Sequence, residues 1–273
     1  MVLNIFRKFT ILLVIILLIQ SCKDPETLPD RLTSYPMNIG TEWIYDREFI
    51  IKKYESETSE DSIENDTMRF TISVRISKDT TLRDSIAVTE FIANEIGTQL
   101  YSKEYFKLDK DGLKTYAYIP TGQYAFEKKK NAEIIGNIKF KTFQLEPVII
   151  DNEGDNFYFY DTPRLSLKLP LSVGDKWTYL SPTEFNNLQI EKEVLGFERL
   201  KFSFGTFDCF KIKYNNTGIE GIERLEIIDW VSVQGLIKRQ IKFDRNMSTT
   251  IDGDLIQFVD WIDILTIKEL TIK

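Results

Sequence analysis

The residue types that carry nucleophilic and metal chemistry in proteins are scarce in this chain. None of its 273 residues is a histidine, and it has two cysteines, Cys22 and Cys209. Without histidine, neither a Ser-His-Asp nor a Cys-His arrangement can be built, and zinc and transition-metal sites lose their usual imidazole ligand. Cys209 lies between aromatic residues in Thr206–Ile212. A thiol without an activating base is expected to be buried and inert.

Carboxylate chemistry is the catalytic class that this composition leaves open. A glycosidase needs two carboxyl groups roughly 5–10 Å apart across a cleft, which Asp260 with Asp263, or Glu220 with Glu223, could provide. The chain has 42 acidic residues, so many pairs meet this spacing by accident. We therefore predict a protein that is not an enzyme and has no catalytic residue. A carboxylate-based hydrolase remains the alternative.

One acidic stretch has the alternating oxygen ligands of a calcium loop. It is Asp151–Asn156, where Asp, Asn and Glu side chains follow one another closely. A calcium-binding EF-hand loop wants Gly at its sixth place and a bidentate Glu at its twelfth, and this chain has Asn156 and Thr162 there. An ordinary polar turn is the simpler interpretation, so we predict no metal site and no cofactor.

Cys22 ends a pattern that is typical of exported proteins. Arg7 and Lys8 give a positive start, and Phe9–Ile19 is apolar apart from Thr10. Eleven apolar residues are too few to cross a bilayer core, which takes roughly 20 in a helix. A charged start, a short apolar segment and a small residue at the cleavage site form an export signal. A buried N-terminal helix, or a signal cut by ordinary peptidase, are the alternatives.

The four residues Ile19-Gln20-Ser21-Cys22 resemble the lipobox of bacterial lipoproteins. This resemblance implies that residues 1–21 are a signal peptide, that the Cys22 sulfur receives a diacylglyceryl group, and that the new N-terminus is acylated after cleavage. Several acyl chains, at about 0.8 kcal/mol per buried methylene, would anchor the chain stably. The expected partner is therefore a membrane, held through the lipid on Cys22.

Residues 22–34 are polar, carry two prolines and have no periodicity, so they are expected to form a tether. Its Cys-Lys-acidic start resembles the surface-export signals of Bacteroidota-type lipoproteins, which implies the outer membrane, on its periplasmic face or at the cell surface. Without residues 1–21, the chain has 33 basic and 42 acidic residues, a net charge of −9. This charge argues against nucleic acid as a partner.

The remainder, 35–273, has the pattern of an all-β domain. Residues 67–76 alternate strictly between polar and apolar side chains, which predicts a strand with one wet face. Close turn signals without helical segments predict an antiparallel meander. Residues 255–273 carry a helical stripe but many β-branched side chains, and we favour strands there. Further strands are expected near residues 43–51, 85–93, 99–108, 113–119, 138–146, 156–161, 176–181, 188–195, 206–214, 223–231 and 236–243.

A sequence pattern recurs within the β domain. Pro36-x3-Gly40-x2-Trp43-x-Tyr45 returns 134 residues later as Pro170-x3-Gly174-x2-Trp177-x-Tyr179, and Gly112-Leu113 is echoed by Gly235-Leu236. Pro and Gly favour a turn, and Trp and Tyr two residues apart share one face of a strand. The recurrence predicts two pseudo-repeated halves, near 35–165 and 166–273, although convergent turns could produce the same pattern.

Three segments, 169–177, 205–212 and 230–238, resemble uncharacterised Bacteroidota-type exported proteins similar to the DUF3108-like group. The resemblance implies a large curved antiparallel sheet, or an unclosed barrel or sandwich, of the kind seen in LolA/LolB-type lipoprotein carriers. It supplies no catalytic residue.

The aromatic residues bear most directly on function. The chain has 19 Phe, 12 Tyr and 4 Trp, which could line a pocket on a concave β face. The simpler interpretation is that they fill the core, and Trp43, Trp177 and Trp230 are expected to anchor the fold. The leading hypothesis is a lipid-anchored, non-enzymatic envelope protein that binds a hydrophobic or extended ligand, or a partner protein. A structural or accessory lipoprotein of an envelope complex is the alternative.

Overall fold

The computed structural model describes residues 31–83, 85–99, 101–119, 139–141, 148–150, 157–182, 187–249 and 255–273. Arg31–Lys273 forms one compact unit. The predicted signal peptide, Cys22 and the Asp151–Asn156 stretch lie outside the described residues. No helix in the described part of the chain is both long and apolar enough to cross a membrane.

The described part is built from fourteen strands and one short 3-10 helix, as the sequence pattern predicts for an all-β chain. The elements are β1 (Glu42–Tyr54), β2 (Glu64–Leu82), β3 (Ile86–Glu95), β4 (Tyr101–Asp109), β5 (Gly112–Ile119), β6 (Lys139–Lys141), β7 (Val148–Ile150), β8 (Tyr158–Lys168), β9 (Lys176–Leu180), β10 (Gln189–Phe202), β11 (Gly205–Thr217), η1 (Ile222–Arg224), β12 (Leu225–Ser232), β13 (Gly235–Thr249) and β14 (Leu255–Thr271).

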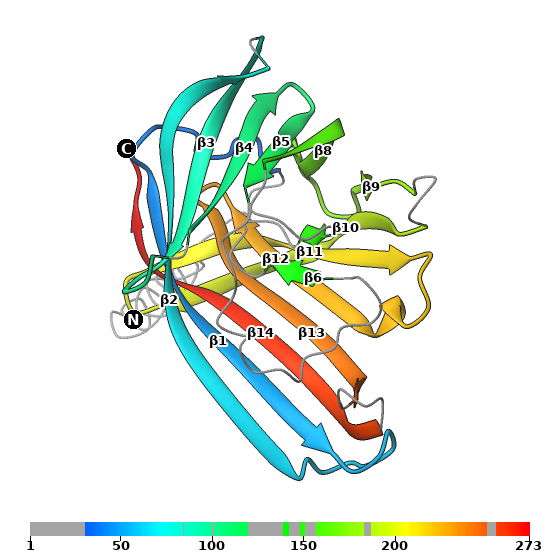
Figure 1. Cartoon of the computed structure of the whole chain (residues 1–273). Helices are drawn as coiled ribbons and strands as arrows, with labels where there is room; N and C mark the ends of the chain where they lie inside the picture. Colours follow the sequence, from blue (N-terminus) through cyan, green and yellow to red (C-terminus); the bar gives the residue numbers. More distant parts are fainter. Residues whose placement is uncertain are drawn as a thin grey trace, which may run out of the picture. The chain divides into compact units, whose positions relative to one another are not determined.

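Twelve of these strands form one antiparallel sheet that curls into a nearly closed barrel (Figure 1). Their order is β8-β5-β4-β3-β2-β1-β14-β13-β12-β11-β10-β9, and β6 and β7 pair separately. In the middle of this order, the first and last strands along the chain lie side by side, and β1 pairs with β14 over nearly its whole length. Strands β8 and β9 are the two edges, so the barrel has one unsealed seam between them. The predicted large curved sheet or unclosed barrel is confirmed.

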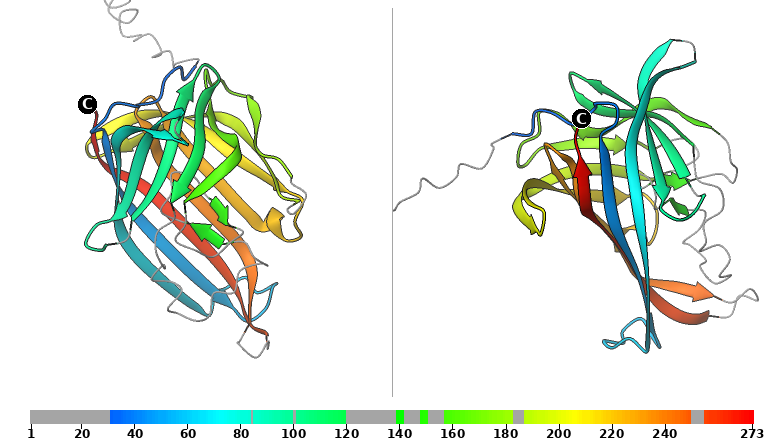
Figure 2. Two further views of the ribbon diagram at one scale, coloured as in Figure 1. Left: turned by 45° about the horizontal axis from the view of Figure 1, so that its top comes forward. Right: turned by 90° about the vertical axis from the view of Figure 1, so that its left-hand side faces the viewer.

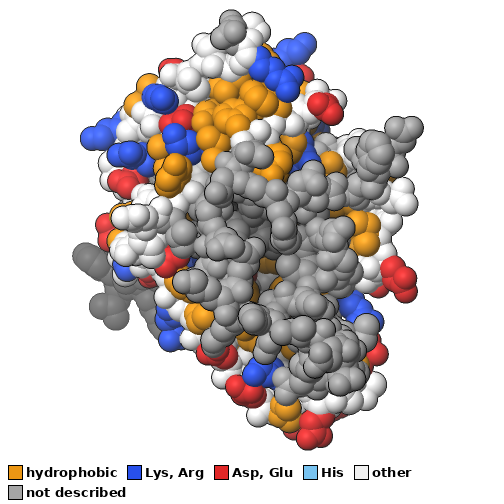
Figure 3. Space-filling view, viewed as in Figure 1, with side chains coloured by type: hydrophobic (Ala, Val, Ile, Leu, Met, Phe, Trp, Pro, Cys, Tyr) orange, Lys and Arg blue, Asp and Glu red, His pale blue; other side chains and the backbone are white. Residues whose placement is uncertain are grey.

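Alternating side chains explain which face of the sheet is inside. In β1, Trp43, Tyr45 and Arg47 point to the interior, and each is at most 1% exposed. The ambiguous C-terminal stretch forms the single strand β14, where β-branched residues outweigh the helical stripe. Figure 3 shows the exterior, where hydrophobic side chains gather over β3, β4 and β5 in an otherwise mixed surface.

The largest cluster of buried apolar side chains draws on the N-terminal segment and on strands from both halves of the sheet. The Trp43 indole Nε1 donates to the carbonyl oxygen of Gln234 at 2.6 Å, and the Tyr45 hydroxyl donates to that of Leu236 at 2.8 Å. These bonds tie β1 to the turn between β12 and β13. Gly235 has a φ of 106° there and lies directly against the indole. Only glycine fits this turn without strain.

The two copies of the sequence pattern adopt the same backbone hydrogen bonds. Gly40 N–H donates to Ile76 O at 2.9 Å, and Gly174 N–H donates to Val194 O at 2.9 Å. Both glycines have a positive φ, 87° and 85°. A register shift follows Ile76 in β2 and Val194 in β10. Each copy therefore opens a meander of six strands, β1 to β5 with β8, and β9 to β14. Descent from an internal duplication stays a prediction.

The substitution Gly235→Ala tests the contact between this turn and Trp43. An added Cβ would lie 2.7 Å from the indole Nε1, in a left-handed backbone conformation, so we expect a loss of about 1–3 kcal/mol in unfolding free energy. Gly196→Ala in β10 is the control, because a Cβ there meets no atom within 4 Å. Urea denaturation measures both. Equal stability of the two variants would contradict the packing described.

Candidate functional site: the seam and the cavity behind it

Side chains, instead of a ladder of backbone hydrogen bonds, hold the seam together. The Trp177 indole Nε1 of β9 donates to Leu165 O of β8 at 2.9 Å. The Lys192 ammonium of β10 donates to Ser166 O of β8 at 2.7 Å. Two further side-chain contacts cross the seam, Lys168 with Asp175 at 2.7 Å and Arg164 over the ring of Tyr179 at 5.5 Å. Among the described residues, no backbone ladder pairs β8 with β9. The seam is therefore the weakest line around the barrel.

A cavity of about 40 Å³ lies in the barrel interior directly behind the seam. This volume has room for a few water molecules. Side chains from both halves of the sheet and from the N-terminal segment line it, namely Tyr35, Phe106, Leu113, Ser166, Leu167, Lys192, Ile212, Tyr214, Asp229, Val231, Leu236 and Arg239. The wall is mostly apolar, with charged groups concentrated on β10, β12 and β13.

A buried ion pair forms the polar side of the cavity. Arg239 donates to Asp229 through Nε at 2.6 Å and through Nη2 at 2.8 Å, and both side chains are under 8% exposed. The Tyr214 hydroxyl donates to the same carboxylate at 2.8 Å. The two parallel hydrogen bonds and the third from the hydroxyl offset the free-energy cost of desolvating the two charges.

Lys192 sits between two aromatic rings at the seam. Its ammonium lies 4.4 Å from the ring centroid of Tyr179 and 4.4 Å from that of Tyr214. Cation–π attraction from both rings helps to keep this buried charge in place.

Burial raises the pKa of the Tyr35 and Tyr45 phenols well above their ordinary range, so both hydroxyls stay neutral donors.

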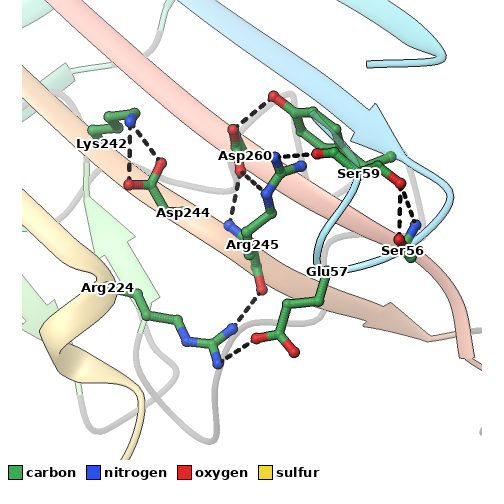
Figure 4. Close-up of polar contacts among 9 residues, drawn as sticks. Ser56, Glu57, Ser59, Arg224, Lys242, Asp244, Arg245 and Asp260 are labelled. Atoms are coloured by element: carbon green, nitrogen blue, oxygen red, sulfur yellow. Dashed lines mark hydrogen bonds and ion pairs between the residues drawn. The ribbon is translucent and has the colours of Figure 1, made fainter. Parts of the chain in front are cut away.

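The structure separates the carboxylates that the sequence suggested as a pair. Asp263 lies in the interior, where Arg47 donates to it through Nε at 2.9 Å and Nη2 at 2.8 Å. Asp260 points to the other face of β14, and accepts the Tyr54 hydroxyl and the Arg245 backbone N–H, both at 2.8 Å (Figure 4). Two carboxylates on opposite faces of one strand cannot act across one cleft.

The second suggested pair, Glu220 and Glu223, is exposed beside the 3-10 helix η1. The neighbouring Arg224 bonds Arg245 O at 2.9 Å and the Glu57 carboxylate at 2.7 Å (Figure 4). These contacts tie the β1–β2 loop to the β13–β14 hairpin at the end of the barrel away from Trp43. Among the described residues, no three His, Cys, Asp or Glu side chains lie close enough to hold a metal ion.

The charged groups of the cavity were not among the predicted site residues, although the sequence carries a signal for them. Lys192 falls between Ile190 and Val194, and Asp229 between Ile227 and Val231, on the apolar side of their strands. Arg239 follows Ile237 on the same face. A charge in the apolar register of a strand must be buried and paired, so each of these positions predicts a polar contact inside the barrel.

Comparisons with known proteins give limited information. One similar solved structure is that of a candidate exported protein with a YmcC-like fold from Bacteroides fragilis. It is 10% identical with a TM-score of 0.28, over 88% of this chain and 99% of that one. No protein-family model and no curated protein matches the chain. At this identity and TM-score the likeness carries no conclusion about function.

Asp229→Asn tests whether the buried ion pair supports the interior. The change leaves the Arg239 charge without its carboxylate, and we expect a loss of about 3–5 kcal/mol in unfolding free energy. Asp208→Asn is a matched control. Arg199 donates to the Asp208 carboxylate through Nε at 2.6 Å and Nη2 at 3.2 Å, the same bidentate arrangement, but both side chains are about one third exposed. We expect about 0–1 kcal/mol there. Equal losses in urea denaturation would show that burial at Asp229 is unimportant.

Proposed function

We propose that this chain is a lipid-anchored, non-enzymatic protein of the outer envelope whose β domain binds a hydrophobic or extended ligand, or an extended part of a partner protein, at the seam between β8 and β9. The lipidation at Cys22 rests on the lipobox-like sequence and the export pattern before it. Acyl chains on Cys22 would hold the protein at the outer membrane, on its periplasmic face or at the cell surface.

The position of the cavity carries the proposal for the β domain. It lies behind the only unpaired edges of the twelve-stranded sheet. Pockets for small molecules measure about 300–1,000 Å³. The cavity of about 40 Å³ is smaller, so the proposal requires β8 and β9 to move apart when a ligand enters. Parting β8 from β9 breaks few bonds, whereas any other line around the described sheet would break a backbone ladder. The seam is thus the route with the lowest cost of entry.

The chemistry of the lining defines the ligand in outline. Phe106, Leu113 and Leu167 offer an apolar wall from β4, β5 and β8. Lys192 of β10 offers a cationic donor on the other side of the cavity, beside the Arg239–Asp229 pair. A ligand with an apolar or extended body and one acceptor-rich group would match both sides. The described carboxylates nearest to this cavity do not suggest hydrolysis, since Asp229 is already held by Arg239 and Tyr214.

Native mass spectrometry of the full chain, expressed in a bacterium with lipoprotein machinery and extracted from its own envelope, tests the proposal. We expect a mature chain that begins at Cys22, carries acyl chains and retains a bound ligand. Lys192→Met should lower ligand occupancy at least about tenfold, because it removes a charge-assisted contact worth about 1.5–3 kcal/mol. Lys211→Met is the control, since Lys211 is a partly exposed cation beside Trp230 on the neighbouring strand.

Each readout of this experiment has an outcome that contradicts the proposal. A Cys22→Ala chain that fractionates with membranes exactly as the parent does would contradict lipid anchoring. A parent protein without a small ligand, but with a bound envelope protein that Lys192→Met does not release, would favour the accessory lipoprotein. Equal ligand occupancy in the two lysine variants would remove the seam as the site.

A further inference from the structure

We infer that the end of the barrel that contains Trp43 rests on the same lipid surface that holds the acylated Cys22. This orientation depends on the proposed lipid anchor, and it adds a second, non-covalent contact between the β domain and the membrane. The occupant of this contact is the headgroup region of the lipid leaflet.

The loops at this end converge because the N-terminal segment crosses it. Leu32 pairs with Leu171, with hydrogen bonds of 3.0 and 2.8 Å between their backbones. Asn38 donates to the carbonyl oxygen of Lys273, which brings the C-terminus to the same place. The β12–β13 turn joins them through Trp43. Figure 2 shows the first described residues, the C-terminus and this turn on one side of the barrel.

Each of these segments exposes an apolar side chain, three of them in turns and one directly after β14. Ile39 is 51% exposed, Val173 57%, Val233 48% and Ile272 50%. Ile39 and Val173 occupy the same place in the two sequence copies, directly before the positive-φ glycines. Single exposed apolar residues are common on protein surfaces, but these four lie in segments that come together at one end of the barrel, and we call them the apolar rim. Such a rim can enter the interface between headgroups and acyl chains.

The length of the tether favours this end over the opposite one. Leu32 is 1% exposed and fixed by backbone bonds, and ten residue steps separate it from Cys22 in the sequence. Fully extended, ten residues span at most about 35 Å. Strand β1 alone, with 13 residues, extends about 40 Å from Glu42 toward the loop after Tyr54. Barrel strands tilt by typically 35–45°, so about 30 Å of this length runs along the barrel axis. If that far loop faced the membrane, the segment between Cys22 and Leu32 would have to run almost fully extended alongside the barrel.

Depth-dependent quenching of an attached fluorophore tests the orientation. Val233→Cys is labelled with an environment-sensitive dye in the full-length acylated protein, which is reconstituted into vesicles of phosphatidylethanolamine and phosphatidylglycerol with doxyl lipids. Ile63→Cys is the control, since Ile63 is 53% exposed in the loop after β1. The native Cys209 should not react, because burial raises the pKa of its thiol to about 12 and it is 0% exposed. The Cys22 sulfur is blocked by its acyl group.

We expect doxyl lipids to quench the dye at residue 233 and to leave the dye at residue 63 at the level of doxyl-free vesicles. Val173→Cys should be quenched like Val233→Cys. Agreement between the two sites shows that the quenching is not caused by a disturbance of one turn. Acylated protein with unquenched dye at both 233 and 173, or with equal quenching at 63, would overturn the orientation while leaving the anchor intact. Absence of acyl chains from the parent protein would instead contradict the proposed function.

Discussion

Pairing between β1 and β14, the first and last strands along the chain, is the interaction on which the whole barrel depends. Strand β1 meets β14 from Glu42 opposite Thr271 to Tyr54 opposite Phe258. The junction joins the two six-stranded meanders, which otherwise have no continuous ladder between them. Inside it, Arg47 and Asp263 form a buried bidentate pair with side chains 1% and 9% exposed. Removing either charge alone would leave the other buried without a partner charge, so the junction depends on both side chains together.

The seam lies where a second junction of the same kind would form. The sixth strand of the second meander, β14, pairs with β1, the first strand of the other meander. The sixth strand of the first meander, β8, does not pair with β9 in the corresponding way. The connections before these two sixth strands differ, since residues 120–157 separate β5 from β8 and residues 250–254 separate β13 from β14. The Trp177 and Lys192 bonds to β8 replace the missing ladder. The proposed binding function rests on this weakly held seam and on the cavity behind it, where Lys192 supplies a positive charge.

The sequence predicted the fold well because strand periodicity and turn residues are local properties. Alternation in β2, the turns at Gly40 and Gly174 and the burial of Trp43, Trp177 and Trp230 all follow from short-range patterns. The position of the seam and the Arg239–Asp229 pair could not be predicted, since both depend on which distant strands become neighbours. The same limit explains why Asp260 and Asp263, three residues apart, suggested a pair that the opposite faces of β14 separate.

Hydrogen–deuterium exchange on the folded protein measures most directly whether β1 and β14 are stably paired and whether the seam between β8 and β9 opens. Backbone amides in a paired interior ladder exchange through rare global opening, whereas edge amides exchange through local fluctuation. The account predicts strong protection for peptides from β1 and β14, and fast exchange for the seam-facing amides of β8 and β9. Protection of β8 and β9 equal to that of β1 and β14 would contradict an openable seam.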